Sequence, residues 1–325
     1  MFGYIKEHAH GSLSPHQYPT ELTMPSVKTP LLEVHYTEHG PADGWPVVLS
    51  HGFPYSPHVY DKVTPHLTQA GARVIIPYLR GYGPTRFLSS ATIRTAQQAA
   101  LASDLIALLD ALNIEKAILA GFDWGGLASC ASTALWPERV AGLVCYAGYD
   151  VYEVATGQRP CAPQLEKIMW YQHLFQSGRG KECLKLHRRE IARMLWQEWS
   201  PNWTFDEELF DLAAKSFENE DFVDIAISPY RHAFGNFRGD PRYDELERRL
   251  AAKPKIVVPA VTVDGVEDPL KPGGTQELSR AMFEGRHGHW KLQIGHAFPI
   301  EAPEEFAKAV LTVREWTQSE QTEPK

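Results

Sequence analysis

Long hydrophobic runs, a cysteine framework and an excess of positive charge are all missing from this sequence of 325 residues. No apolar segment approaches the roughly 20 residues that a membrane-spanning helix needs, and residues 1–30 contain no apolar core of a signal peptide. We therefore expect a cytoplasmic protein with no membrane partner.

Cysteine is scarce, with four residues and no Cys-x-x-Cys pair. This number and spacing exclude the disulfide frameworks of small secreted proteins. Reduced, mostly buried thiols are expected at Cys130, Cys145, Cys161 and Cys183. Two histidine pairs, each separated by one residue, lack a cysteine or carboxylate partner at ligand spacing, so a surface role rather than a metal site is expected for His8, His10, His287 and His289.

The formal net charge of −8 leaves no basic footprint for nucleic acid or for anionic lipid. Hydrophobic residues make up 43% and charged residues 22% of the chain, which are the proportions of a globular protein. Small molecules and proteins remain as expected partners, and a homodimer is left open.

Strand-like apolar segments alternate with helical segments in the first half of the chain. In 99–112 the leucines follow i, i+4, i+7 and i+8, as in a helix that lies on a sheet. Segment 140–146 is mainly apolar, as strands are when both faces of a sheet are covered. Strands are predicted at 31–39, 47–50, 73–77, 117–121, 140–146, 256–263 and 289–294, and helices at 60–70, 99–112, 124–137, 274–283 and near the end of the chain. This order predicts a mostly parallel, doubly wound α/β sheet.

The composition changes near residue 150. Residues 151–252 are rich in Trp, Tyr, Arg and Glu, with helical periodicity and no convincing strand. We therefore assign 1–150 and 253–325 to an α/β core, and 151–252 to an inserted helical cap. The cap is expected over the C-terminal edge of the sheet, where ligands bind in such folds. Residues from about Gln318 onward are polar, and fraying is expected there.

Residues 117–130 are predicted to form a strand, a sharp turn and a helix, and they contain the first candidate for a catalytic residue. An apolar run ends at Gly121, Asp123 follows, and Gly125 and Gly126 lead into small residues suited to a helix. This is the layout of a G-x-S-x-G nucleophile elbow with aspartate in the position of serine. Taken alone, the segment is more simply explained as an acid in an ordinary βα loop. Whether Asp123 is a nucleophile therefore depends on whether the other residues of a catalytic set occur later in the chain.

Two later residues supply those partners. In hydrolases with such an elbow, a nucleophile, an acid and a histidine follow in this order, each at the end of a different strand. Asp123, Asp268 and His296 occur in this order and at such places. Taken alone, Asp268 is more simply explained as a turn aspartate before proline, and His296 as a loop histidine. The occurrence of all three residues in the expected order, each after a predicted strand, favours a catalytic set.

The chain resembles the epoxide hydrolase and haloalkane dehalogenase branch of the α/β-hydrolases, from about residue 31 to residue 316. The motifs that carry the resemblance are His51-Gly52-Phe53-Pro54, Arg80-Gly81-Tyr82-Gly83, Gly121-Phe122-Asp123-Trp124-Gly125-Gly126, Gly265 with Asp268, and Gly295-His296. The resemblance implies an α/β-hydrolase fold with an inserted helical cap and no cofactor or metal. It also implies that Asp123 is the nucleophile, that Asp268 orients His296, and that His296 activates water.

An aspartate nucleophile suits this chemistry because a carboxylate can displace a leaving group from saturated carbon and form an alkyl ester. The helix that follows Asp123 favours the ionised form of its carboxylate. Water activated by His296 would then attack the ester carbonyl. By resemblance, the backbone N–H groups of Phe53 and Trp124 form the oxyanion hole.

The leaving group separates the two activities of this branch. An opened epoxide leaves an alkoxide that needs a proton, whereas a halide needs only weak donors. Epoxide hydrolases similar to this chain use two cap tyrosines, matched here by Tyr171 in the segment Tyr171-Gln172-His173-Leu174-Phe175 and by Tyr230 before Arg231. Without this context, each tyrosine is more simply explained by packing.

Several positions depart from one or the other pattern. Dehalogenases of this branch often carry Asn where Phe53 stands, and fluoroacetate dehalogenases carry Arg where Trp124 stands, so both positions favour an epoxide. From the epoxide hydrolase pattern, Phe122 replaces the usual histidine, Tyr78 an aspartate, and Ser228-Pro229 the common Asn-Trp. These differences leave the shape of the substrate open.

We therefore expect a cofactor-free epoxide hydrolase that forms a vicinal diol through an aspartyl ester. The aromatic-rich cap indicates an apolar or aromatic epoxide and water as its small-molecule partners. A haloalkane dehalogenase is the first alternative. A hydrolase-fold binding protein or a non-hydrolytic pathway enzyme is the second, and the complete set of Asp123, Asp268 and His296 argues against it.

Overall fold

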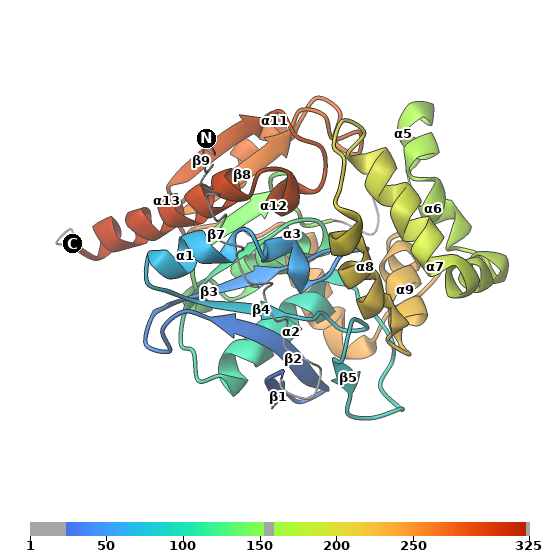
Figure 1. The fold of residues 1–325 in the computed structure, drawn as a ribbon, viewed down its shortest axis with the longest axis horizontal. Coiled ribbons are helices and arrows are strands. Elements are labelled where there is room, and N and C mark those ends of the chain that lie inside the picture. Colours follow the sequence, from blue (N-terminus) through green and yellow to red (C-terminus); the bar gives the residue numbers. More distant parts are fainter. Residues whose placement is uncertain (1–23, 153–158, 323–325) are drawn as a thin grey trace, which may run out of the picture.

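The structure is a computed structural model that describes residues 24–152 and 159–322. Within these residues, nine strands form one mixed sheet in the order β1-β2-β4-β3-β6-β7-β8-β9, with β5 beside β2. β2 pairs antiparallel with β1, β4 and β5, and the pairs from β4 to β9 are all parallel. The predicted mostly parallel, doubly wound α/β sheet is confirmed (Figure 1).

After three successive strands, helices separate β3 from β4, β5 from β6 and β6 from β7. The strands are β1 (Ser26–Lys28), β2 (Leu32–His39), β3 (Trp45–Ser50), β4 (Ala72–Pro77), β5 (Arg86–Phe87), β6 (Ala117–Gly121), β7 (Val140–Tyr146), β8 (Ala260–Gly265) and β9 (His287–Leu292). The helices that alternate with them are α1 (Thr64–Gln69), α2 (Gln98–Ala111), α3 (Trp124–Leu135), α11 (Gln276–Arg280), α12 (Phe298–Glu301) and α13 (Pro303–Thr322).

Helices cover both faces of the sheet. On β7, a Cβ added to Gly142 would lie 2.2 Å from Val313 of α13. Three residues later, the thiol of Cys145 lies 3.5 Å from the Gly126 carbonyl oxygen of α3. Residues three apart on a strand point to opposite faces, so α13 and α3 lie on opposite sides. The strands between them are therefore buried on both faces, which explains their near-continuous apolar sequences.

In the described residues, six further helices lie between β7 and β8, and α5 to α9 gather at the right-hand side of Figure 1. They are α5 (Pro163–Ile168), α6 (Trp170–Leu174), α7 (Gly178–Trp199), α8 (Glu207–Lys215), α9 (Phe222–Ala233) and α10 (Asp244–Ala251). Side-chain caps begin two of them: Ser177 accepts from the Gly180 N–H at α7, and Asp206 accepts from the Glu208 N–H at α8. These six helices and the residues that connect them, 159–252, are called the helical insertion below.

One carboxylate of the insertion completes a helix of the core. Glu247 of α10 accepts a hydrogen bond of 3.1 Å from the Ala99 N–H in the first turn of α2. The same carboxylate accepts from the Gln97 and Gln98 side-chain amides at 3.2 Å and 3.0 Å. The first N–H groups of a helix have no intrahelical acceptor. Glu247 of the insertion therefore supplies a hydrogen-bond acceptor to the first turn of α2.

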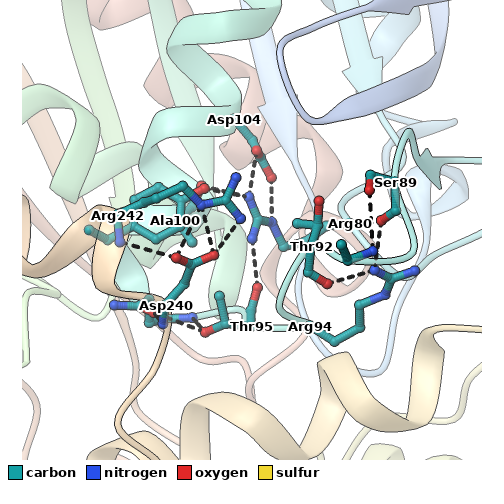
Figure 2. A network of polar contacts seen from close by, with 12 residues as sticks. Arg80, Ser89, Thr92, Arg94, Thr95, Ala100, Asp104, Asp240 and Arg242 are labelled. Atoms are coloured by element: carbon teal, nitrogen blue, oxygen red, sulfur yellow. Dashed lines mark hydrogen bonds and ion pairs between the residues drawn. The ribbon is translucent and has the colours of Figure 1, made fainter.

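A buried arginine lies in a polar network between the core and the insertion (Figure 2). Arg80 donates two parallel hydrogen bonds to Asp104 of α2, at 2.6 Å and 2.7 Å, and a third to the Thr95 carbonyl. Its guanidinium also lies 3.3 Å from the Tyr243 hydroxyl of the insertion. Burial opposes the charge of Arg80, but Asp104 outweighs this effect and raises the pKa of the guanidinium.

Replacement of Arg80 by methionine is expected to lower the free energy of unfolding by about 3 kcal/mol, because it leaves a largely buried Asp104 without its cation. Arg80 is 1% and Asp104 13% exposed. Urea denaturation followed by circular dichroism measures the change. Arg238→Met is the matched control, since its partner Asp244 is 49% exposed and such pairs contribute about 0–1 kcal/mol. Equal effects of the two substitutions would contradict this account.

Proline explains two differences from the predicted elements. In place of one helix over 60–70, the structure has a 3-10 turn at Pro57–Tyr60 and then the short α1. Pro65 has no N–H to donate within a continuous helix and suits the first turn of a new one. The strand predicted at 256–263 begins only at Ala260 because Pro259 cannot donate a ladder bond.

Other boundaries were wrong for different reasons. β9 covers 287–292 rather than 289–294, and its residues are mostly half-buried, so it has no apolar run. β1 and β5 were missed because three and two residues carry no periodicity. The helix predicted at 274–283 is shortened to α11, and it cannot begin at Gly274, which has a φ of +78°. α13 continues to Thr322, so fraying from Gln318 is wrong up to that residue.

Two expectations from composition can be compared with the structure. All four cysteines are free, but only Cys130 and Cys145 are buried, whereas Cys161 is exposed and Cys183 half-buried. The prediction of mostly buried thiols is therefore correct for two of them. In the part of the chain that the structure describes, none of the helices has an apolar stretch sufficient for a membrane span.

Candidate active site

The turn between β6 and α3 places Asp123 above the sheet. β6 ends at Gly121, and Asp123 has φ +51° and ψ −131° before α3 begins. A side chain rarely adopts such a backbone, and it persists only where the surroundings impose it. The crossing is tight, because a Cβ on Gly125 would lie 1.8 Å from the Ser50 carbonyl oxygen of β3. The glycines that framed the predicted elbow are therefore required by close backbone contact.

Two groups contact the Asp123 carboxylate. Its Oδ1 accepts a 2.6 Å hydrogen bond from the Phe53 N–H, and its Oδ2 lies 3.3 Å from His296 Nε2. Gly52 permits this approach, since a Cβ there would lie 2.4 Å from Oδ1. Trp124 is the first residue of α3, and an N–H at this position has no intrahelical acceptor. The two backbone donors expected from the sequence therefore flank Asp123.

A continuous chain of side chains leads away from Asp123. His296 Nδ1 lies 2.9 Å from Asp268 Oδ2, and Asp268 Oδ1 accepts from the Leu270 N–H at 2.8 Å. The Tyr146 hydroxyl lies 3.1 Å from Asp268 Oδ2 and donates to the Gly295 carbonyl at 2.6 Å. His296 and Asp268 are both buried. The structure thus brings the three predicted residues together and adds Tyr146 to them.

The charge state of His296 follows from its two carboxylate neighbours. Burial disfavours the imidazolium, but Asp268 and Asp123 outweigh burial and raise the pKa of His296 from 6.5 to about 10. The imidazole is therefore protonated at neutral pH before any reaction. Because the pKa is raised on folding, this ionisation contributes stability below pH 6.5 and the contribution is lost as the pH rises through about 10.

We expect an NMR titration of the His296 ring to show a pKa near 10 in the protein without substitutions. Asp123→Asn should lower this pKa, since it removes one of the two carboxylates while keeping the shape of the side chain. A His296 that titrates near 6.5 in the protein without substitutions would contradict the charge state proposed from the geometry.

The two predicted tyrosines meet above Asp123. Tyr171 belongs to α6 and Tyr230 to α9, and their ring centroids are 5.3 Å apart with the planes at 90°. Burial raises the pKa of both hydroxyl groups, while the Gln172 amide, which donates to Tyr171 at 3.0 Å, acts in the opposite direction on that residue. Both hydroxyl groups are therefore protonated at neutral pH.

Tyr230 follows a proline inside a helix. Pro229 has no N–H to donate to the Ile225 carbonyl, but the Ser228 hydroxyl donates to that carbonyl at 2.8 Å instead. The same hydroxyl accepts from the Ala96 N–H at 2.8 Å and ties α9 to the core. In the Ser228-Pro229 pair, which departs from the family pattern, the serine thus provides the hydrogen bond to the Ile225 carbonyl that the proline cannot provide.

A cavity of about 280 Å³ contains these groups. It lies between the ends of β6 and β7 and the helices α6 and α9, and the five candidate residues that line it are Asp123, Trp124, Tyr171, Tyr230 and His296. Asp268 stands behind His296, and Phe53 packs under the cavity, with its ring 5.4 Å from that of Trp124. Phe53 also packs on Tyr171 and Tyr230.

Four functional candidates were not predicted. Tyr146, Asp150, Tyr152 and Lys271 all line the cavity. A signal was present for three of them, because Tyr146 ends β7 and Asp150 and Tyr152 follow it, and the C-terminal ends of parallel strands form the ligand-binding edge. Lys271 lies three residues after Asp268, in a loop whose path the sequence does not specify.

The histidine pair at 287 and 289 has a structural role that was not expected. His287 and His289 lie 2.9 Å from the Thr262 hydroxyl, and the His289 side chain is 6% exposed, beside Asp264. The predicted surface role is wrong for His289. Across residues 24–152 and 159–322, no group of three or more His, Cys, Asp or Glu side chains is placed to hold a metal ion. His8 and His10 lie outside the described residues.

An acid on a strained turn between strand and helix, hydrogen-bonded to a histidine and backed by a second acid, defines an α/β-hydrolase site. The family model for the alpha/beta hydrolase fold matches residues 46–173. A solved structure from Klebsiella pneumoniae, provisionally assigned as an epoxide hydrolase, is 40% identical and has a TM-score of 0.88. The match covers 90% of this chain and 98% of that one.

Two curated relatives represent both activities of the branch. An epoxide hydrolase of Caballeronia sordidicola is 26% identical over 314 residues, which cover 86% of this chain and 90% of the relative. A haloalkane dehalogenase of Psychrobacter cryohalolentis is 40% identical over 110 residues, or 34% and 36% of the two chains. The chain belongs to the α/β-hydrolase family, within the branch of epoxide hydrolases and haloalkane dehalogenases.

Proposed function

We propose that the protein hydrolyses epoxides to vicinal diols through an ester on Asp123. The observation that carries this proposal is the pair of protonated hydroxyl groups of Tyr171 and Tyr230 in the same cavity as the Asp123 carboxylate. An alkoxide needs a proton donor when an epoxide opens, and a halide does not. The likeness to the Klebsiella pneumoniae and Caballeronia sordidicola proteins supports the same reaction.

The first step forms the ester. An Asp123 carboxylate oxygen attacks one epoxide carbon, the carbon–oxygen bond of the ring breaks, and the alkoxide takes a proton from Tyr171 or Tyr230. Esterification removes the negative charge of Asp123, one of the two carboxylates that raise the pKa of His296. The pKa of His296 therefore falls, the imidazolium returns a proton to the tyrosinate, and neutral imidazole is left.

The second step hydrolyses the ester. Neutral His296, oriented by Asp268, takes a proton from water, and the resulting hydroxide attacks the ester carbonyl. The Phe53 and Trp124 N–H groups stabilise the oxyanion, and one such donor is typically worth about 3 kcal/mol of barrier. Collapse of this intermediate breaks the ester bond, and the departing alkoxide takes a proton from His296 to give the diol. The carboxylic acid left on Asp123 then passes its proton to the neutral imidazole, which restores the Asp123 carboxylate and the protonated His296.

An isotope experiment tests the reaction class. With a single turnover in H₂¹⁸O, we expect the diol to contain no ¹⁸O, because its new oxygen comes from Asp123, and the label to enter the protein. Incorporation of ¹⁸O into the diol in the first turnover would show direct attack by water and would refute the ester mechanism. Release of halide from haloalkanes faster than diol formation would favour the second candidate below.

A haloalkane dehalogenase is the second candidate, supported by the Psychrobacter cryohalolentis relative and by the indole of Trp124 at the cavity. An indole N–H is a donor of the strength that a halide needs. The second halide donor of such dehalogenases is often an Asn side chain. In this chain Phe53 occupies that position, and its side chain has no donor. This difference ranks the epoxide first.

The aromatic lining leads us to propose an apolar or aromatic scaffold for the substrate. The rings of Trp124, Tyr171 and Tyr230 face the cavity over the packed ring of Phe53. A panel of epoxides in which small polar members turn over fastest would contradict this proposal. We further propose that the insertion acts as a cap over the core and that the protein functions in the cytoplasm.

A further inference from the structure

The mechanism above leaves two charged side chains of the cavity without a role. Asp150 follows β7, and Lys271 lies in the loop that also carries Asp268. Both line the same cavity as Asp123 and His296. The Lys271 N–H donates to the Asp268 carbonyl at 3.3 Å, so the position of Lys271 is tied to that of the acid behind His296.

These two charges face each other without direct contact. Lys271 Nζ lies 4.0 Å from Asp150 Oδ1, whereas a direct charge-assisted hydrogen bond is about 2.7–2.9 Å long. Within the described residues, the Asp150 carboxylate accepts no hydrogen bond, although its side chain is only 26% exposed. Burial raises the pKa of Asp150, and Lys271 acts against this rise. A donor and an acceptor are thus both available in the cavity wall.

The arrangement discriminates among ligand groups. A carboxylate would be attracted by Lys271 but repelled by Asp150 and Asp123, and an ammonium would be attracted by Asp150 but repelled by Lys271 and by protonated His296. A hydroxyl group is neutral, donates one hydrogen bond and accepts others. It alone among these can donate to Asp150 and accept from Lys271 at the same time.

We propose that Asp150 and Lys271 form a hydroxyl-binding site, so that the preferred substrate is an apolar epoxide that also carries an alcohol group. This inference rests on the proposed function for its reaction but concerns a different part of the cavity. A hydrogen bond to a charged group contributes enough to change affinity by about ten- to a hundredfold. The site therefore selects among epoxides without taking part in the chemistry of ring opening.

A matched series of aryl epoxides tests the proposal. The members differ only in one ring substituent, which is methyl, hydroxymethyl, carboxylate or aminomethyl. For the unaltered protein we expect kcat/KM for the hydroxymethyl compound to exceed that for the methyl compound by about tenfold or more. The difference should appear mainly in KM, because the hydrogen bonds are present in the bound substrate as well as in the transition state.

Substitutions identify the residues responsible. Asp150→Asn and Lys271→Met should each reduce the hydroxymethyl preference about tenfold. The double variant should lose little more than either single one, because both residues bind the same hydroxyl group. Asp43→Asn and Lys291→Met, at exposed positions outside the cavity, are the matched controls and should keep the preference. An unchanged preference in both single variants, or a faster carboxylate or aminomethyl compound, would overturn the proposal.

A binding measurement separates this proposal from the proposed reaction. The methyl and hydroxymethyl diols, which cannot react further, are titrated into the protein by calorimetry. Tighter binding of the hydroxymethyl diol, by about tenfold and lost in Asp150→Asn, supports the site even if no epoxide is turned over. Equal binding of the two diols refutes the hydroxyl site even if the methyl epoxide is hydrolysed.

Discussion

Replacement of His296 by glutamine is expected to leave a stable covalent adduct on Asp123 after treatment with an epoxide. The substitution removes the base for ester hydrolysis but not the nucleophile or the tyrosine donors, so the first step proceeds and the second stops. Loss of a positioned general base costs about 10²- to 10⁴-fold in rate. Mass spectrometry should show the protein heavier by one epoxide, and peptide mapping should place the added mass on Asp123.

The variant should remain folded. Glutamine can donate to Asp268, which also keeps the Leu270 N–H as a donor. Asp123→Asn combined with His296→Gln is the control, since an amide keeps the shape of the side chain and is not a comparable nucleophile. An adduct in the double variant, or on another residue, would remove Asp123 from the role of nucleophile. No adduct and no activity across a broad epoxide panel would favour a binding protein.

Replacement of both Tyr171 and Tyr230 by phenylalanine is expected to reduce diol formation by about 10²- to 10⁴-fold, because the alkoxide then lacks the two proposed proton donors. Burial keeps both hydroxyl groups protonated, so either can act alone, and each single variant should lose much less than the pair. Rapid-quench measurement of ester formation locates the loss in the first step.

The control for this experiment is Tyr149→Phe, which removes a hydroxyl outside the cavity that donates to the Pro254 carbonyl. A haloalkane provides the second comparison, since its leaving group needs no proton. If the double variant loses epoxide and haloalkane turnover equally, Tyr171 and Tyr230 shape the cavity rather than donate protons. If it keeps epoxide turnover, the assignment of the two donors is wrong.

Elements with a strong period were predictable. Strand β7 was predicted to the residue, and α2 within one residue at each end, because an apolar run and a leucine pattern reflect burial directly. The order of Asp123, Asp268 and His296 was enough to predict their convergence, since each follows a parallel strand of one sheet. These strands are β6, β8 and β9, and parallel strands end at the same edge. Their catalytic roles stay predictions.

Features that depend on how distant loops meet were not predictable. Tyr146 hydrogen-bonds Asp268 and Gly295, which are 122 and 149 residues away, and no local pattern announces such a contact. The pairing of Asp150 with Lys271 likewise depends on two loops that follow different strands. The Ser228 hydroxyl replaces a hydrogen bond that the helix loses at Pro229. A prediction of this contact would have required knowledge of the path of α9. Here the tertiary structure, rather than the local sequence, decides the chemistry.

The hydrogen bonds of Glu247 have a consequence for the modularity of this fold. A helix of the core obtains the acceptor for its first turn from the last helix of the insertion, so neither part is complete when it is separated from the other. An insertion transplanted from a relative would have to bring a carboxylate to the same place. A chimera that lacks this carboxylate would lose the acceptor at the start of α2, even with every residue that lines the cavity preserved. In this protein, the substrate range is therefore changed more safely by substitution of single lining residues than by exchange of the whole insertion.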